Sequence, residues 1–154
     1  LEAGEDPLYV ARRLVRFASE DVGIADSNAL VVAVAAYQAC HFNGMPECSV
    51  NLAQAVVYLS MAPKSNSAYN AINAAMRDIR KGKVGQVPRH LQNVHADSTG
   101  SGKAPAYKYP HDYPHHYVAQ RYLPEALGDV TYYEYGDNKT EQAARRYWED
   151  IKKN

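Results

Sequence analysis

Apolar residues recur at helical spacing through the first half of the chain. The first stripe, with members three or four positions apart, consists of Leu8, Ala11, Val15, Ala18 and Val22. This period places all of them on one face of an α-helix. Asp6 suits the N-cap, Pro7 suits the first position, and Gly23 suits the end. The pattern therefore predicts a helix from residue 7 to about residue 22.

Three more helices are predicted before residue 82. One begins after Asp26 or Ser27 and stops at Gly44, and the next runs from residue 46 to about 62, before Pro63. The last begins near Ser65 and closes at residue 82. Its apolar stripe is Ala68, Ile72, Ala75 and Ile79. No alternation typical of a β-strand competes in this half.

The stretch from Ser27 to Pro63 contains a single formal charge, Glu47. A helix without a polar face is either wrapped on all sides by its own chain or meets another chain. Both alternatives stay open at this point. If the second holds, the candidate subunit interface is Val31, Val32, Val34, Tyr37 and Val56.

The second half is rich in tyrosine and proline. A small polar loop, residues 97–106, precedes it, and a helix from about Lys139 to Lys152 closes the chain. Between them we expect a fixed strap that lies over the helices, because prolines break this stretch into short turns. The strap residues are Tyr109, Pro110, His111, Asp112, Tyr113, Pro114, Gln120, Tyr122, Leu123 and Pro124.

The charge balance argues against a chain that is drawn as a whole to nucleic acid. The 154 residues hold 17 Lys and Arg against 17 Asp and Glu. One local cluster is basic: Arg77, Arg80, Lys81, Lys83 and Arg89. It is the candidate DNA contact, and interleaved tyrosines beside Lys108 and Arg121 would add a stacking surface. A solvated face and a structural strap are the alternatives.

Candidate chemistry is sparse. His111, Asp112, His115 and His116 crowd together, but Pro114 breaks the helical register that would pair two histidines as metal ligands. The sequence holds no G-x-S-x-G motif. Gly100 to Lys103 is followed by Ala104, so it does not complete a phosphate loop. We therefore expect no catalytic, cofactor or metal site in this chain.

Two cysteines, Cys40 and Cys48, make no disulfide framework. The longest apolar run, residues 29–37, is too short to cross a bilayer. The opening letters LEAGEDP lack a methionine, and we expect a piece of a longer protein.

Eight blocks carry a family resemblance that covers the whole chain. In order they are LEAGEDPLYVARRLVRFASEDVG, MPE, LAQAVVYLSMAPKSN, SAYNAINAA, VPRHLQN, YPHDYP, QRYLP and YGDNKTE. Together they resemble the C-terminal region of the replication-associated recombination protein family, the RarA/MgsA AAA+ ATPases related to the Werner-helicase-interacting ATPase.

The resemblance implies an all-α domain that packs like a clamp-loader collar and assembles its ATPase as a homotetramer. It implies an ATPase core before this region, using ATP and magnesium, with no Walker motif in this chain. It further implies a bacterial cytoplasmic, nucleoid-associated protein that acts on forks, DNA ends and gaps, with single-strand-binding protein as a partner. His115 and His116 depart from the family, which more often carries small residues such as glycine there.

These observations predict one C-terminal domain over residues 1–154: a helical core over about 6–92, a loop over 97–106, and a strap with a final helix over 107–154. The predicted function is oligomerisation of a AAA+ ATPase in replication-fork maintenance. The alternative is a DNA-binding module that uses the basic cluster and the tyrosines.

Overall fold

A computed structural model of the chain describes residues 1–92 and 107–153. Over these residues the regular structure is helical and contains no β-strand. The α-helices are α1 (Pro7–Phe17), α2 (Asn28–Asn43), α3 (Cys48–Met61), α4 (Ser67–Arg80) and α5 (Lys139–Lys153). The predicted all-α class is confirmed.

Helix α1 begins as its sequence predicts and ends differently. Asp6 Oδ1 accepts a hydrogen bond from Leu8 N at 3.0 Å, and Pro7 occupies the first turn. The α-helix stops at Phe17, and the chain continues as a π-helical turn over Ala18–Val22. Gly23 then takes a φ of 54°. The periodicity reaches Val22 because a π turn keeps nearly the same face buried.

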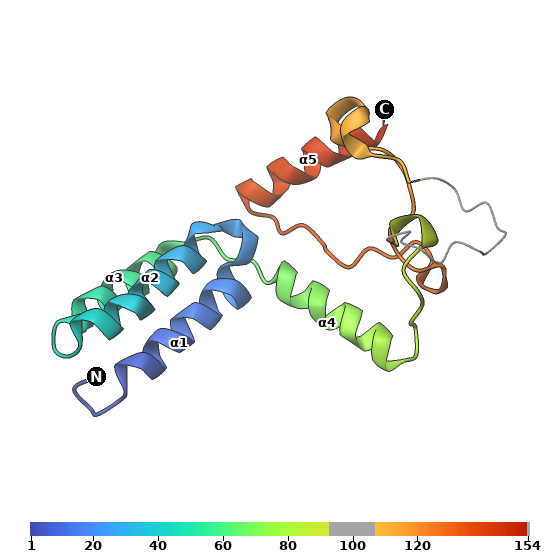
Figure 1. Cartoon of the computed structure of the whole chain (residues 1–154). Helices are drawn as coiled ribbons and strands as arrows, with labels where there is room; N and C mark the ends of the chain where they lie inside the picture. Colours follow the sequence, from blue (N-terminus) through green and yellow to red (C-terminus); the bar gives the residue numbers. More distant parts are fainter. Residues whose placement is uncertain (93–106, 154) are drawn as a thin grey trace.

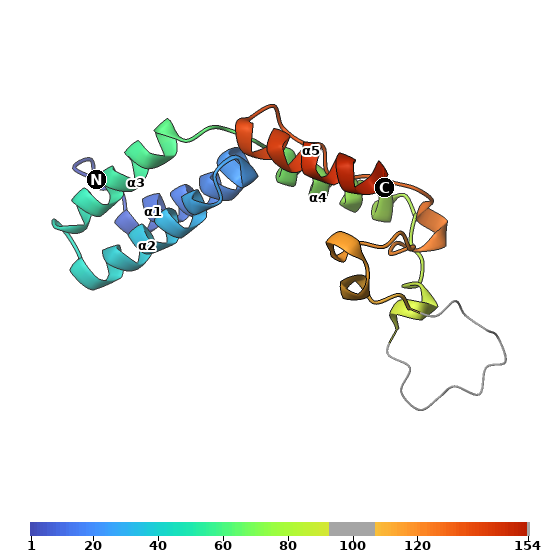
Figure 2. The ribbon, with the colours of Figure 1, turned by 90° about the horizontal axis from the view of Figure 1, so that it is seen from above.

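Helices α1, α2 and α3 lie side by side as a bundle (Figures 1 and 2). The core that they share consists mostly of small side chains. Its buried members on the three helices are Ala11, Ala29, Ala33, Ala36, Cys40, Cys48, Leu52, Ala55 and Leu59. Small residues let helix backbones approach closely, so the bundle is tight and its interior holds little bulk.

Helix α4 leaves the bundle and runs, with α5 and the strap, to the side opposite the α2–α3 turn (Figure 1). Two members of its apolar stripe do not pack into a core: Ile72 and Ile79 are each 58% exposed. Instead, α4 contacts the segment before α5, where the Tyr132 hydroxyl donates to Asp78 Oδ2 at 3.0 Å. The stripe stays open because no element of the described chain lies across it.

A buried carboxylate joins the bundle to the start of α5. Glu141 is fully buried and accepts hydrogen bonds from the Tyr133 hydroxyl, Asn138 Nδ2 and, at 3.0 Å, Gly136 N. The Ser65 hydroxyl also bonds to it. Ser65 N in turn donates to the Asp21 carbonyl at 2.8 Å. One serine between α3 and α4 therefore connects both halves of the molecule.

Candidate functional site

The surface of the bundle carries large apolar side chains where a lone bundle would carry polar ones. On α2, Val31 is 63% exposed and Phe42 is 86% exposed. On α3, Val50 is 71%, Val57 56% and Met61 81% exposed. Single exposed apolar residues are ordinary, but rows of them on adjacent helices mark an interaction surface.

The spacing of these residues shows that they form two ridges. On α2, Val31, Ala35, Gln38 and Phe42 follow one another at steps of four, three and four, and so do Val50, Gln54, Val57 and Met61 on α3. We call these two rows, each apolar except for one glutamine, the outer ridges. Each faces away from the buried side of its helix, on which Ala33 and Leu52 lie. The bundle thus buries mostly small residues, together with Leu52 and Leu59, and exposes larger apolar side chains on the outer ridges.

The predicted interface residues fall on several sides of the helices. Val31 lies on an outer ridge, and Val34 and Val56 are also exposed, at 38% and 43%. Val32 and Tyr37 are half-buried. Tyr37 packs against the core cluster that contains Cys40 and Cys48, and it lines a shallow hollow with Val34.

Sequence reasoning missed Phe42, Val50, Val57 and Met61. Their four-and-three spacing was present in the letters. It could not be assigned to an outer face, since the inner rows of small residues have the same period.

Helix α4 carries a second uncovered apolar row. Its members are Tyr69 at 41%, Ile72 at 58%, Met76 at 40% and Ile79 at 58% exposure. They recur at steps of three, four and three, so they share one face of the helix. The row lies beside the face of α4 that holds Asp78 against Tyr132. The chain therefore has apolar surface to cover on both of its halves.

The basic cluster occupies the last turn of α4 and the segment after it. Arg77 and Arg80 are exposed in that last turn, with Lys81 as its C-cap. Lys83 Nζ lies 3.5 Å from Asp78 Oδ1. The Tyr132 hydrogen bond, with help from Lys83 and against the effect of burial, holds the pKa of Asp78 below its ordinary value. Arg77, Arg80, Lys81 and Arg89 form no ion pair within the described part of the chain.

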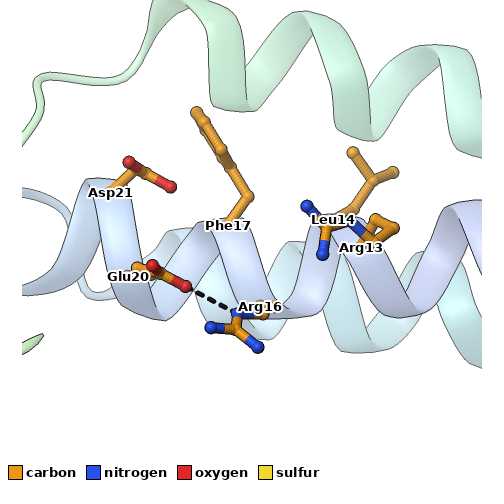
Figure 3. A pocket seen from close by; sticks show the side chains of 6 residues that line it. All are labelled: Arg13, Leu14, Arg16, Phe17, Glu20 and Asp21. Carbon is orange, nitrogen blue, oxygen red and sulfur yellow. Dashed lines mark hydrogen bonds and ion pairs between the residues drawn. The ribbon is translucent and has the colours of Figure 1, made fainter.

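A second group of cations, which the sequence reasoning did not single out, lines α1. Arg13 and Arg16 border an open groove with Glu20 and Asp21 (Figure 3). Arg16 Nε donates to Glu20 Oε2 at 2.6 Å, and this contact raises the pKa of the guanidinium. Acidic side chains thus balance the arginines here, and the groove presents no net field to an anion.

The strap is a series of short turns. Tyr109, His111, Asp112 and Tyr113 are exposed in turns that begin at Pro110 and Pro114. Gln120 exchanges hydrogen bonds with the backbone of Lys108, at 3.1 and 2.8 Å. Tyr117, outside the predicted set, meets Trp148 of α5 with ring centroids 6.0 Å apart.

The other end of the strap lies near the segment after α4. Tyr122 and Leu123 are exposed, and Tyr122 Oη lies 3.0 Å from Gln120 Nε2. Pro124 packs so closely against Gly85 that a Cβ at Gly85 would come within 2.7 Å of the proline ring. The absence of a side chain at residue 85 therefore lets this contact form.

His115 and His116 adopt φ angles of 56° and 53°. This left-handed region favours glycine and costs other residues about 1 kcal/mol. The two histidines thus hold a backbone shape that suits the small residues implied by the resemblance. Over the described residues, no group of three or more His, Cys, Asp or Glu side chains lies close enough to hold a metal ion.

The two cysteines lie in the bundle interior near the α2–α3 turn. Burial, followed by the neighbouring Cys48 thiol, raises the pKa of Cys40 to about 11. A thiol with such a pKa stays protonated at neutral pH and is a poor nucleophile. Within the described chain, no helix is both long and apolar enough to span a bilayer.

Residues 1–152 match the model of the family described as MgsA AAA+ ATPase C terminal. The chain belongs to this family. It is 52% identical over 134 residues to an uncharacterized AAA domain-containing protein of Mycobacterium tuberculosis, covering 86% of this chain and 30% of that protein. It is 41% identical over 155 residues to replication-associated recombination protein A of Bacillus subtilis, covering 99% and 37%. ATPase WRNIP1 of Dictyostelium discoideum is 43% identical over 137 residues, covering 88% and 16%.

Membership in the MgsA C-terminal family confirms the resemblance that the eight sequence blocks carry. The chain spans little more than a third, or less, of the relatives that it matches. The relatives are therefore longer than the part of them that aligns with this chain.

Proposed function

We propose that this chain is the oligomerisation unit of a AAA+ ATPase that maintains replication forks and supports recombination and repair. The observation that carries the proposal is the exposure of large apolar side chains on the bundle. The interior holds mostly alanine and cysteine, with Leu52 and Leu59, while Val31, Val57 and Met61 are exposed. A chain that worked alone would lose solubility from this arrangement, whereas an assembling chain gains an interface.

Closed symmetry makes the proposal specific. When an apolar row on one subunit binds a different surface on the next subunit, the subunits form a ring if the rotation between neighbours closes on itself, and a fibre if it does not. A stable interface buries on the order of 1,200–2,000 Å² in total. Val31, Val57 and Met61 on the outer ridges, together with the α4 row, supply apolar side chains on both halves of the chain for such contacts. Four copies in a closed ring agree with the resemblance to clamp-loader collars.

The remaining roles belong to the whole protein. We propose that the parent binds ATP and magnesium in its AAA+ part and acts on forks, DNA ends and gaps with single-strand-binding protein. We place it in the bacterial cytoplasm, associated with the nucleoid. The support is the family and the name replication-associated recombination protein A of several relatives. This chain itself contributes no catalytic residue in the proposal, since its sequence contains no Walker motif.

Sedimentation of the 154-residue chain at micromolar concentrations tests the proposal. We expect a tetramer, or a dimer that dissociates from it. Val31→Asp should shift the mass toward monomer, because it introduces an unpaired charge on an outer ridge. Helix content by circular dichroism should stay unchanged, since Val31 is 63% exposed in the single chain. Gln86→Asp adds the same charge at an exposed position outside both rows and should leave the mass unchanged.

A wild-type chain that remains monomeric up to high concentration would refute the proposal for this chain. Loss of helix content in Val31→Asp would instead show that residue 31 supports the fold. In that case Met61→Asp, at an 81% exposed position on α3, repeats the test.

DNA binding is the second candidate function. Its specific support is that Arg77, Arg80 and Lys81 form no ion pair in the described chain and cluster at one helix end. Phosphate contacts make affinity fall steeply with salt. Arg80→Glu with Lys81→Glu should weaken binding about equally for all sequences and flatten the salt dependence. A matched pair on α5, Lys139→Glu with Lys152→Glu, should have little effect, and equal losses in both pairs would remove the α4 cluster from consideration.

A further inference from the structure

Three exposed apolar side chains lie at and beside the turn between α2 and α3. Phe42 is 86% exposed, Met45 48% and Val50 71%. We call these three residues the apolar tip. Glu47 is the one formal charge in the stretch from Ser27 to Pro63, and it is exposed in the same turn. The tip therefore offers an apolar contact with a carboxylate close by in the sequence.

The tip is held in a defined shape. Gly44 N donates to the Cys40 carbonyl at 3.1 Å, and Cys48 N donates to the Gly44 carbonyl at 2.8 Å. Asn43 Nδ2 reaches Asn51 Oδ1 at 2.9 Å and so ties the two helices together beside the turn. The Cys48 thiol lies 3.6 Å from the Met45 sulfur. A surface ordered before it binds loses little conformational entropy on binding.

The tip lies at the end of the bundle where the chain begins (Figures 1 and 2). Leu1 packs against the core cluster that contains Cys40 and Cys48, just beneath the turn. The matched family is the C-terminal region of AAA+ ATPases, and the relatives extend well beyond the matched part. The ATPase part of such a protein would thus join the bundle beside the apolar tip.

We infer that the apolar tip docks onto the AAA+ part of the same polypeptide and thereby fixes the angle between the ATPase and its oligomerisation unit. This inference rests on the proposed function, because it requires the chain to be the C-terminal unit of such an ATPase. Val31 precedes Phe42 by eleven residues on one helix, about 17 Å along its axis. The tip and the far end of the ridge can therefore serve different neighbours.

The size of the tip favours a tethered occupant over a free one. Three side chains cover far less than the roughly 1,000 Å² that a stable contact between separate molecules needs. A segment joined to Leu1 through the backbone is present at an effective concentration in the millimolar range. At that concentration a small, preorganised apolar contact suffices to hold two units in register.

Photo-crosslinking in the full-length protein tests the inference. Phe42 is replaced by p-benzoylphenylalanine, and the same replacement at Met61, 81% exposed at the opposite end of the hairpin, is the control. We expect the probe at residue 42 to link to a peptide that precedes residue 1. Mixing isotopically light and heavy protein before assembly shows whether a link lies within one chain, and we expect links within one chain only.

Two results would overturn the inference. One is a link from residue 42 to a second copy, which would make the tip part of the subunit interface. The other is that the probe at residue 42 crosslinks to peptides before residue 1 with no higher yield than the control probe at residue 61. Sedimentation of Phe42→Ser in the full-length protein separates this inference from the proposed function. The mass of Phe42→Ser should equal that of the wild type. If the proposed function is wrong, the wild type itself will not form an oligomer.

Discussion

Glu141 is the one charged side chain that is fully buried in residues 1–92 and 107–153. Burial alone would raise its pKa, but hydrogen bonds from Tyr133, Gly136, Ser65 and Asn138 lower it to about 2. Burial, followed by the hydrogen bond to Glu141 and the charge of that carboxylate, raises the pKa of Tyr133. The carboxylate is therefore ionised at any physiological pH, and it acts as a fixed acceptor rather than as a titrating switch.

The first prediction concerns the pH dependence of this contact. The folded-state pKa of Glu141 lies below its ordinary value of 4.5, so the folded state binds the proton less tightly than the unfolded state. Its stabilisation, on the order of 3 kcal/mol, is complete above about pH 5 and is lost as the pH falls toward 2. In Glu141→Gln, the free energy of unfolding should be lower at pH 7 and should fall less between pH 5 and pH 2.

Urea denaturation at a series of pH values measures this effect. Glu134→Gln, an exposed carboxylate in the same segment, is the control and should leave the pH dependence unchanged. Equal slopes for the wild type and Glu141→Gln between pH 5 and pH 2 would contradict the assigned pKa.

The second prediction concerns the strained backbone at His115. This residue has φ 56° and ψ 15° and is exposed, so its side chain contributes little that glycine would lose. His115→Gly should raise the free energy of unfolding by up to about 1 kcal/mol, because glycine adopts this conformation without a Cβ clash. His111→Gly, in the same strap but without a positive φ, should give no gain. A gain of equal size in both variants would contradict this explanation, because glycine otherwise adds entropy to the unfolded chain and lowers stability.

Among the elements, the junction between the π-helical turn and α4 depends on close backbone approach. Gly23 has a φ of 54°, and a Cβ there would lie 2.9 Å from the Ser65 carbonyl oxygen. The same Ser65 bonds to Asp21 and to Glu141. Gly23 therefore sets how tightly the bundle meets the start of α4.

The third prediction separates this clash from backbone strain. Gly44 also has a positive φ, 65°, but a Cβ there meets open space. Gly44→Ala should cost about 1–3 kcal/mol from strain alone, because φ 65° with ψ −176° is a backbone region that only glycine adopts readily. Gly23→Ala should cost about 1–3 kcal/mol more, because the Ser65 carbonyl and the backbone at residue 23 must move apart to admit the new Cβ. Urea denaturation followed by circular dichroism gives both values, and equal losses would show that the Ser65 contact yields without cost.

For the molecule as a whole, the chain should not bind nucleotide. The fourth prediction is that titration of the 154-residue chain with Mg-ATP gives no heat of binding. Its sequence contains no phosphate-binding loop, which is a glycine-rich loop between a strand and a helix that ends in Lys-Ser or Lys-Thr. The full-length protein, with the AAA+ part that we propose for it, is the control and should bind. Micromolar affinity of the isolated chain for ATP would overturn its proposed role as a non-catalytic unit.

Much of the secondary structure could be read from local chemistry. Asp6 and Pro7 begin α1 where a cap and a proline are favourable, and Gly44 and Gly82 follow α2 and α4 with positive φ angles. The helices from residue 7 to residue 80 follow from apolar periods and from such punctuation. These features depend on neighbours within one or two turns, which the order of residues states directly.

The inside and outside of the bundle could not be read in the same way. In α2 and α3 almost every position is uncharged, so the pattern offers several apolar faces of equal period. The bundle buries the faces that carry Ala33 and Ala55, because helices make more contact when small side chains let them approach closely. The bulkier Val31 and Met61 consequently lie on the exposed faces of these helices.

The contact of Ser65 with Glu141 lies beyond any local pattern. Asn138 and Glu141 suggest a helix start, but no periodicity links residue 141 to a serine before α4. Such pairing depends on how the whole chain closes, as does the exposure of Ile72 on α4. The order of residues therefore specifies where helices begin and end, whereas packing between distant segments specifies which faces they bury and which stay exposed.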